Sequence, residues 1–163
     1  MIRTIGDDGE MVKLDERAVV PEVDMAARER LAKALDREGV VAAMLIGSQA
    51  RGNPGPLSDV DIAYWHDPEL DREASWKLRL ALLGAAEETL RTDQIDLVPL
   101  NEVPTLMQQR SIRDAVLLVE RDHDERIRLE TRAILDYLDT QPLRDAVREG
   151  VRRRIQEGRF GRR

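Results

Sequence analysis

The residues best suited to chemistry lie in one short stretch, where ten residues separate Gly47-Ser48 from Asp59, and Asp61 follows two positions later. Alternation along a strand puts Asp59, Asp61 and Ala63 on one face. Two carboxylates this close raise each other's pKa, and a divalent cation removes that cost. Mg²⁺ is typically held by one or two carboxylates together with substrate phosphates. The stretch therefore predicts a magnesium site facing a small-residue turn that can seat a triphosphate.

A third acidic residue, Asp96, falls inside a later apolar strand, which we expect over residues 92–100. A charge within such a strand is seldom buried without a partner or an ion. The alternative is a strand-end aspartate that faces solvent. If Asp96 meets Asp59 and Asp61 at one edge of a small sheet, the three carboxylates have the chemistry to hold metal for an in-line phosphoryl displacement.

The elements that position these residues follow from hydrophobic periodicity and from turn and capping signals. We expect an α+β fold: a small mixed β-sheet with helices on one face and a C-terminal helical pair. Residues 1–20 form an N-terminal extension, 21–121 the main domain and 122–163 a helical segment that packs on the domain or on a partner. We expect helices over residues 21–38, 69–91 and 103–114. The first begins at Pro21, and the second has Trp76 in the stripe that faces the core. We expect strands over residues 40–46, 58–64, 92–100 and 115–120.

Composition limits the function. The chain has 163 residues, enough for one domain with a real core, and no apolar run long enough to span a bilayer. With no cysteine and two histidines, it offers neither a thiolate site nor a histidine-rich metal site. The start of the chain lacks an apolar signal core, so we expect a cytoplasmic protein. Direct nucleic-acid binding is not expected, because aromatic residues make up only 3% of the chain.

Charge is unevenly distributed along the chain. The net charge is −6, yet residues 141–163 contain eight arginines against three acidic residues. A basic tail on an acidic body is typical of an interaction surface, although a solvated helix face gives the same pattern.

At this point the chain resembles a known family. Gly47-Ser48, ten intervening residues and Asp59-Val60-Asp61 match the G-S-x10-D-x-D motif of the DNA polymerase β-like nucleotidyltransferases. The apolar strand before Gly47, the Ala50-Arg51-Gly52 that follows and a third aspartate on a later strand also agree. The size resembles the minimal nucleotidyltransferases (MNT). Residues 95–122 and the helical pair after them are similar to the antitoxin branch that pairs with HEPN-domain toxins.

The resemblance implies roles for single residues. Gly47 and Ser48 would contact the nucleotide phosphates, and Arg51 would touch phosphate or stay a solvent-exposed loop residue. Asp59 and Asp61 would ligate one or two Mg²⁺ ions. Asp96 would complete the metal site and act as base on the incoming hydroxyl.

The reaction that the resemblance implies is transfer of AMP from ATP to a tyrosine of a cognate HEPN ribonuclease toxin, which neutralises it. Two alternatives remain open. One is a small-molecule nucleotidyltransferase of the aminoglycoside-modifying kind, whose acceptor pocket the acidic body would suit. The other is an antitoxin that acts by binding alone, against which the intact motif argues.

Overall fold

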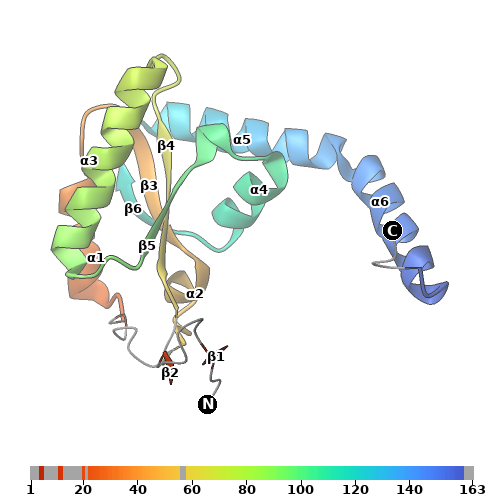
Figure 1. Cartoon of the computed structure of the whole chain (residues 1–163). Helices are drawn as coiled ribbons and strands as arrows, with labels where there is room; N and C mark the ends of the chain where they lie inside the picture. Colours follow the sequence, from red (N-terminus) through yellow and green to blue (C-terminus); the bar gives the residue numbers. More distant parts are fainter. Residues whose placement is uncertain (1–3, 6–10, 13–19, 21, 56–57, 160–163) are drawn as a thin grey trace.

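A four-stranded mixed sheet lies at the centre of the protein (Figure 1). The computed structural model describes residues 4–5, 11–12, 20, 22–55 and 58–159. The strand order is β5-β4-β3-β6, with β3 antiparallel to both neighbours and β4 parallel to β5. The strands are β3 (Val40–Ile46), β4 (Val60–His66), β5 (Ile95–Pro99) and β6 (Val116–Glu120). This mixed sheet confirms the predicted fold class.

Helices cover both faces of the sheet (Figure 1). On one face, α1 (Met25–Leu35) and α3 (Arg72–Leu90) form the larger core with the strands. On the other, α5 (His123–Asp139) packs beside α4 (Thr105–Arg113). The prediction placed the helices on one face and had the C-terminal pair pack on the domain or on a partner; the structure packs α5 on the second face. The remaining elements are β1 (Thr4–Ile5), β2 (Met11–Val12), α2 (Gly47–Ala50), the 3₁₀ helix η1 (Leu100–Glu102) and α6 (Gln141–Gln156).

Alternation along β4 assigns its side chains to the two cores. Val60, Ile62 and Tyr64 belong to the core under α1 and α3. Ala63 and Trp65 belong to the core under α4 and α5. Successive strand residues point to opposite faces, so Asp61 shares the face of Ala63 and Trp65. The prediction that Asp61 and Ala63 lie on the same face of the strand is therefore confirmed.

Helices α1 and α3 begin at least three residues later than predicted. Helix α1 starts at Met25 rather than at Pro21, which lies outside the described residues. The side chain of Asp24 caps it by accepting from the backbone N–H of Ala27 at 2.7 Å. Helix α3 starts at Arg72, capped in the same way by Asp71. In both cases an aspartate three residues before a free backbone N–H decides where the helix starts.

The prediction that Trp76 lies in the core is wrong. Trp76 is 56% exposed, because the buried stripe of α3 runs through Leu78, Leu82 and Ala86 at four-residue steps. Trp65 of β4 is the tryptophan that fills the core, with 2% exposure. Two apolar stripes lie on α3, and the sheet covers the one through Leu78 and Leu82.

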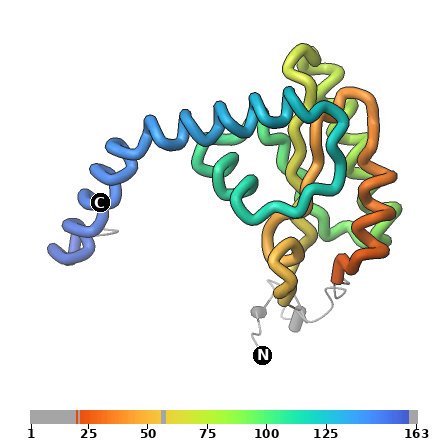
Figure 2. The backbone as a smooth tube through the Cα atoms, turned by 180° about the vertical axis from the view of Figure 1, so that it is seen from behind, coloured from red at the N-terminus to blue at the C-terminus, as the bar shows by residue number. Residues whose placement is uncertain are grey.

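The C-terminal helices differ in packing. Helix α5 buries Ala133 against the second core, whereas α6 buries no residue at all. Figure 2 shows α6 continuing from the end of α5 away from the rest of the protein. Among the described residues, no helix has the length and apolar character that crossing a membrane requires.

Candidate active site

The turn between β3 and α2 is built around the lack of a side chain at Gly47. Its φ of +70° lies in the left-handed region, which glycine adopts at little cost. A Cβ atom at this position would come within 2.0 Å of the Asp61 Oδ2 atom. The turn therefore holds the Gly47 backbone against the carboxylate of Asp61, and Ser48 follows directly in α2.

Gln49 anchors the same turn to the segment before α1 and to α1 itself, a role that the sequence did not predict. Its side chain is almost fully buried, and Oε1 accepts a hydrogen bond from the backbone N–H of Val23 at 3.0 Å. Arg28 of α1 donates to the Gln49 carbonyl at 3.5 Å. No periodic or motif signal marks a glutamine of this kind, because its partners lie more than twenty residues away.

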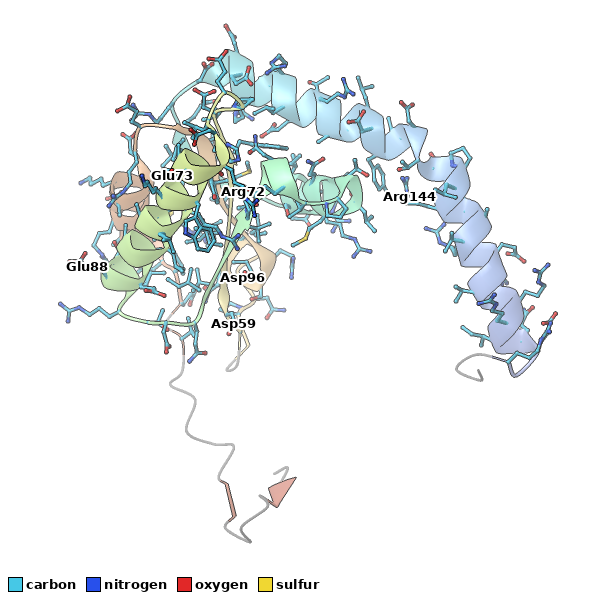
Figure 3. All side chains as sticks on the ribbon, turned by 45° about the horizontal axis from the view of Figure 1, so that its top comes forward. Asp59, Arg72, Glu73, Glu88, Asp96 and Arg144 are labelled. Carbon is cyan, nitrogen blue, oxygen red and sulfur yellow. The ribbon has the colours of Figure 1, made fainter. Side chains whose placement is uncertain are left out.

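Asp61 and Asp96 stand side by side on neighbouring strands. They are register partners in the parallel β4–β5 pair, so they share a face of the sheet. Asp61 is half-buried, and Asp96 is exposed. Asp59 is exposed and lies one residue before the start of β4. Figure 3 shows Asp59 and Asp96 at the same end of the sheet. The structure therefore brings the three predicted carboxylates to one region.

The electrostatics of this region favour a cation. Burial raises the pKa of the Asp61 carboxyl, and the neighbouring charges of Asp96 and Asp59 raise that pKa further. The Arg51 guanidinium lowers the same pKa. A carboxylate whose ionised form is disfavoured by two like charges gains most from a positive ligand.

The fit to magnesium rests on the donor set. Three carboxylates offer the hard oxygen ligands that Mg²⁺ takes. Among the residues that the structure describes, no three histidine or acidic side chains are gathered closely enough to hold a metal ion as they stand. Asp61 and Asp96 are adjacent in register, and the charges of Asp96 and Asp59 both act on the Asp61 carboxyl, so the donor set fits Mg²⁺ in its chemistry.

Arg51 and Ser58 flank the site at the two ends of its loop. Arg51 follows the last residue of α2 and is exposed, and its charge reaches Asp61 and Asp114. Ser58 forms two hydrogen bonds with Gly55. Its Oγ accepts from the Gly55 N–H at 2.8 Å, and its own N–H donates to the Gly55 carbonyl at 3.0 Å.

A separate cavity of about 660 Å³ lies beside α3 and contains none of the three carboxylates. In its lining, Ser75 links two other polar groups: its Oγ atom lies 3.4 Å from the His66 Nε2 atom and 3.3 Å from the Glu102 Oε1 atom. Figure 3 shows Arg72 and Glu73 on α3 away from Asp59 and Asp96. The cavity is lined by Arg72, Glu73, Ser75, Trp76, Arg79 and Glu102.

Comparison with known families agrees with this geometry. The family model described as "Polymerase beta, Nucleotidyltransferase" matches residues 29–124. That range contains β3 to β6 and all six predicted site residues. The chain belongs to this family and carries a polymerase β-type nucleotidyltransferase domain.

Among solved structures, the fold of this chain is similar to toxin–antitoxin structures. A toxin–antitoxin structure with AMP-PNP matches at 25% identity and a TM-score of 0.59, covering 76% of this chain and 97% of that chain. A variant of an MntA toxin–antitoxin complex matches at 26% identity and 0.55, covering 74% and 91%. The tri-AMPylated Shewanella oneidensis HEPN toxin in complex with MNT antitoxin matches at 23% and 0.55, covering 77% and 96%, and shows likeness of fold alone. No curated protein matches the chain.

Proposed function

We propose that this protein is a magnesium-dependent antitoxin that transfers AMP from ATP to a tyrosine of a cognate HEPN ribonuclease toxin. The observation that carries the proposal is the contact between the Gly47 backbone and Asp61, with Asp96 beside Asp61 in register. The match to a toxin–antitoxin structure with AMP-PNP supports ATP as the nucleotide and a toxin as the partner. Both ATP and magnesium are abundant in the cytoplasm, where we place the protein.

The roles follow from position. Gly47 and Ser48 hold the phosphates, and Arg51 approaches them from the end of α2. Asp59, Asp61 and Asp96 are the residues that would hold magnesium, and the bound ion would supply charge stabilisation for the displacement. Positioning and charge stabilisation account for most of the catalysis in phosphoryl transfer.

The transfer itself balances as a single displacement. The tyrosine oxygen attacks the α-phosphorus of ATP, and the bond from that phosphorus to the bridging oxygen of the β-phosphate breaks. Pyrophosphate leaves with the electron pair. The exposed carboxylate of Asp96 takes the tyrosine proton. The AMP group then adds bulk and negative charge beside an RNA-cutting site, where it repels the phosphate backbone.

The experiment is label transfer from α-labelled ATP to the purified HEPN protein encoded beside this chain. We expect label on the toxin only with Mg²⁺ and only with ATP. The variant Asp59→Asn/Asp61→Asn should lose transfer by at least about a thousandfold, the scale of losing electrostatic stabilisation in the transition state. Asp93→Asn, at a nearby exposed carboxylate outside the site, serves as the matched control.

Two outcomes would overturn the proposal. Label on aminoglycosides and none on the toxin would identify a small-molecule nucleotidyltransferase instead. Full neutralisation of the toxin by Asp59→Asn/Asp61→Asn would show an antitoxin that acts by binding alone.

A further inference from the structure

Helix α6 carries an apolar surface that nothing in the described part of the chain covers. It runs for 16 residues and buries none of them. Leu143, Val147 and Ile155 are each more than half exposed, and Val151 is 38% exposed. Most helices in proteins are stabilised mainly by packing an apolar face against other elements. The uncovered face therefore points to a binding partner.

The joint between α5 and α6 is specifically built. The Arg144 guanidinium stacks over the Tyr137 ring at 3.7 Å and donates hydrogen bonds to the Tyr137 carbonyl and the Thr140 hydroxyl. The Thr140 hydroxyl also donates to the Tyr137 carbonyl, at 2.9 Å. Figure 3 shows Arg144 at this joint. These contacts hold α6 in its projecting position, so its exposure is a property of the fold.

The shape of the apolar surface selects a helical partner. Leu143, Val147, Val151 and Ile155 follow one another at four-residue steps, and such a row forms a ridge that fits the groove of another helix. We call these four residues the α6 ridge. Two small residues, Ala146 and Gly150, lie beside the ridge and allow close approach. No aromatic residue occurs in α6, so base stacking by a single-stranded nucleic acid has no platform.

The charge of α6 selects the sign of the partner. The helix contains five arginines and two acidic residues. Among the described residues, Arg152, Arg153 and Arg154 form no ion pair. A second copy of α6 would carry the same excess of positive charge, which disfavours pairing between copies. An acidic surface would instead complement them.

We propose that the α6 ridge docks on an acidic, helical face of the HEPN toxin and so delivers the toxin to the active site. This inference rests on the proposed function for the identity of the partner. It does not rest on catalysis, because α6 lies beyond residues 29–124, which match the nucleotidyltransferase family.

The test measures the Kd of the complex between the full-length chain and the HEPN protein, using the catalytically silenced Asp59→Asn/Asp61→Asn background. Adding Val147→Gln/Val151→Gln should raise the Kd by on the order of 10- to 100-fold, the scale of losing buried anchors at an interface. Glutamine favours helix more than valine does, so α6 stays intact. The matched control is Asp145→Gln/Glu149→Gln, which should bind at least as tightly because it removes two acidic charges.

The outcomes separate this inference from the proposed function. Ridge-dependent binding without any label transfer in the unsilenced chain would support the docking surface and overturn the adenylyltransferase. Label transfer together with an unchanged Kd in Val147→Gln/Val151→Gln would do the reverse. A ridge-dependent homodimer, or ridge-dependent binding to anionic phosphatidylserine vesicles with no effect on the toxin complex, would also overturn the inference.

Discussion

The backbone of Gly47 lies against the carboxylate of Asp61, so closely that a methyl group at Gly47 would come within 2.0 Å of the Oδ2 atom. This contact joins the turn after β3 to the neighbouring strand β4. It explains why a glycine opens the Gly47-Ser48 pair, because any side chain there would displace the carboxylate. The turn that we propose for the triphosphate and the carboxylate that we propose for the metal therefore lie in direct contact.

Gly47→Ala should lower AMP transfer by on the order of a hundredfold, because moving a reacting group by about 1 Å has an effect of that size. Gly52→Ala separates the clash from the backbone strain. Gly52 has a φ of +68°, close to that of Gly47, but a methyl group added there would meet no atom of the described residues within 4 Å. Gly52→Ala should lose about 1 kcal/mol of folding free energy, the cost of a left-handed alanine, and Gly47→Ala should lose at least as much because it adds the clash with Asp61. Equal transfer rates in the two variants would contradict the account.

Asp61→Asn should raise stability at neutral pH while it abolishes transfer. The raised pKa of Asp61 means that the folded state holds the proton more tightly than the unfolded state does. The stability from this group is therefore fully present below the unfolded-state pKa of 3.8 and is lost as the pH rises through the folded value. We expect a gain of about 0.5 kcal/mol at pH 7, small because solvent screens the carboxylates. Urea unfolding at pH 7 and pH 3.5 measures it, and the gain should shrink at the lower pH.

Tyr64→Phe should stabilise the protein. The Tyr64 hydroxyl is buried and has no hydrogen-bond partner among the described residues, and burial raises its pKa to about 12. Removing an unpaired buried hydroxyl should add about 1 kcal/mol to the free energy of unfolding. In the wild type, the stability tied to the Tyr64 proton is full below pH 10 and falls as the pH rises through about 12. Thermal melts between pH 8 and pH 12 should show less alkaline loss for the phenylalanine variant; a lower Tm at pH 8 would count against this reasoning.

The two tryptophans should respond differently to truncation. Trp65→Ala removes a core side chain and should cost about 3–5 kcal/mol. Trp76→Ala, at a residue that is 56% exposed, should cost less than about 1 kcal/mol. Urea unfolding measures both. Iodide should quench the fluorescence of Trp76 in the Trp65→Phe variant, and a shielded Trp76 would contradict the exposed position.

Local sequence signals were sufficient to predict that Asp61 and Asp96 lie close together. They were not sufficient to predict how the helices pack around the sheet. Strand alternation predicted the shared face of Asp61 and Ala63, because a period of two is fixed by backbone geometry. The convergence of Asp61 with Asp96 required only that two short strands pair in register. Gln49 was missed, because its hydrogen bond to Val23 depends on tertiary contact.

Helix α3 shows most clearly what the sequence alone could not predict. Two apolar stripes lie on this one helix, and the sequence cannot weigh them without knowing which side the sheet covers. The stripe through Leu78 and Leu82 is buried, and Trp76 is left in solvent. The sequence predicted the C-terminal helical pair, but only the structure shows that α6 buries none of its residues.

The most direct test of the central claim is Mn²⁺ binding in the presence of AMP-PNP, followed by electron paramagnetic resonance. We expect the wild type and Asp93→Asn to bind Mn²⁺ with the same affinity. Asp61→Asn and Asp96→Asn should each weaken binding by at least about tenfold, within the range that loss of groups around a metal produces. Undiminished Mn²⁺ binding by Asp61→Asn would contradict the claim that these carboxylates hold the metal.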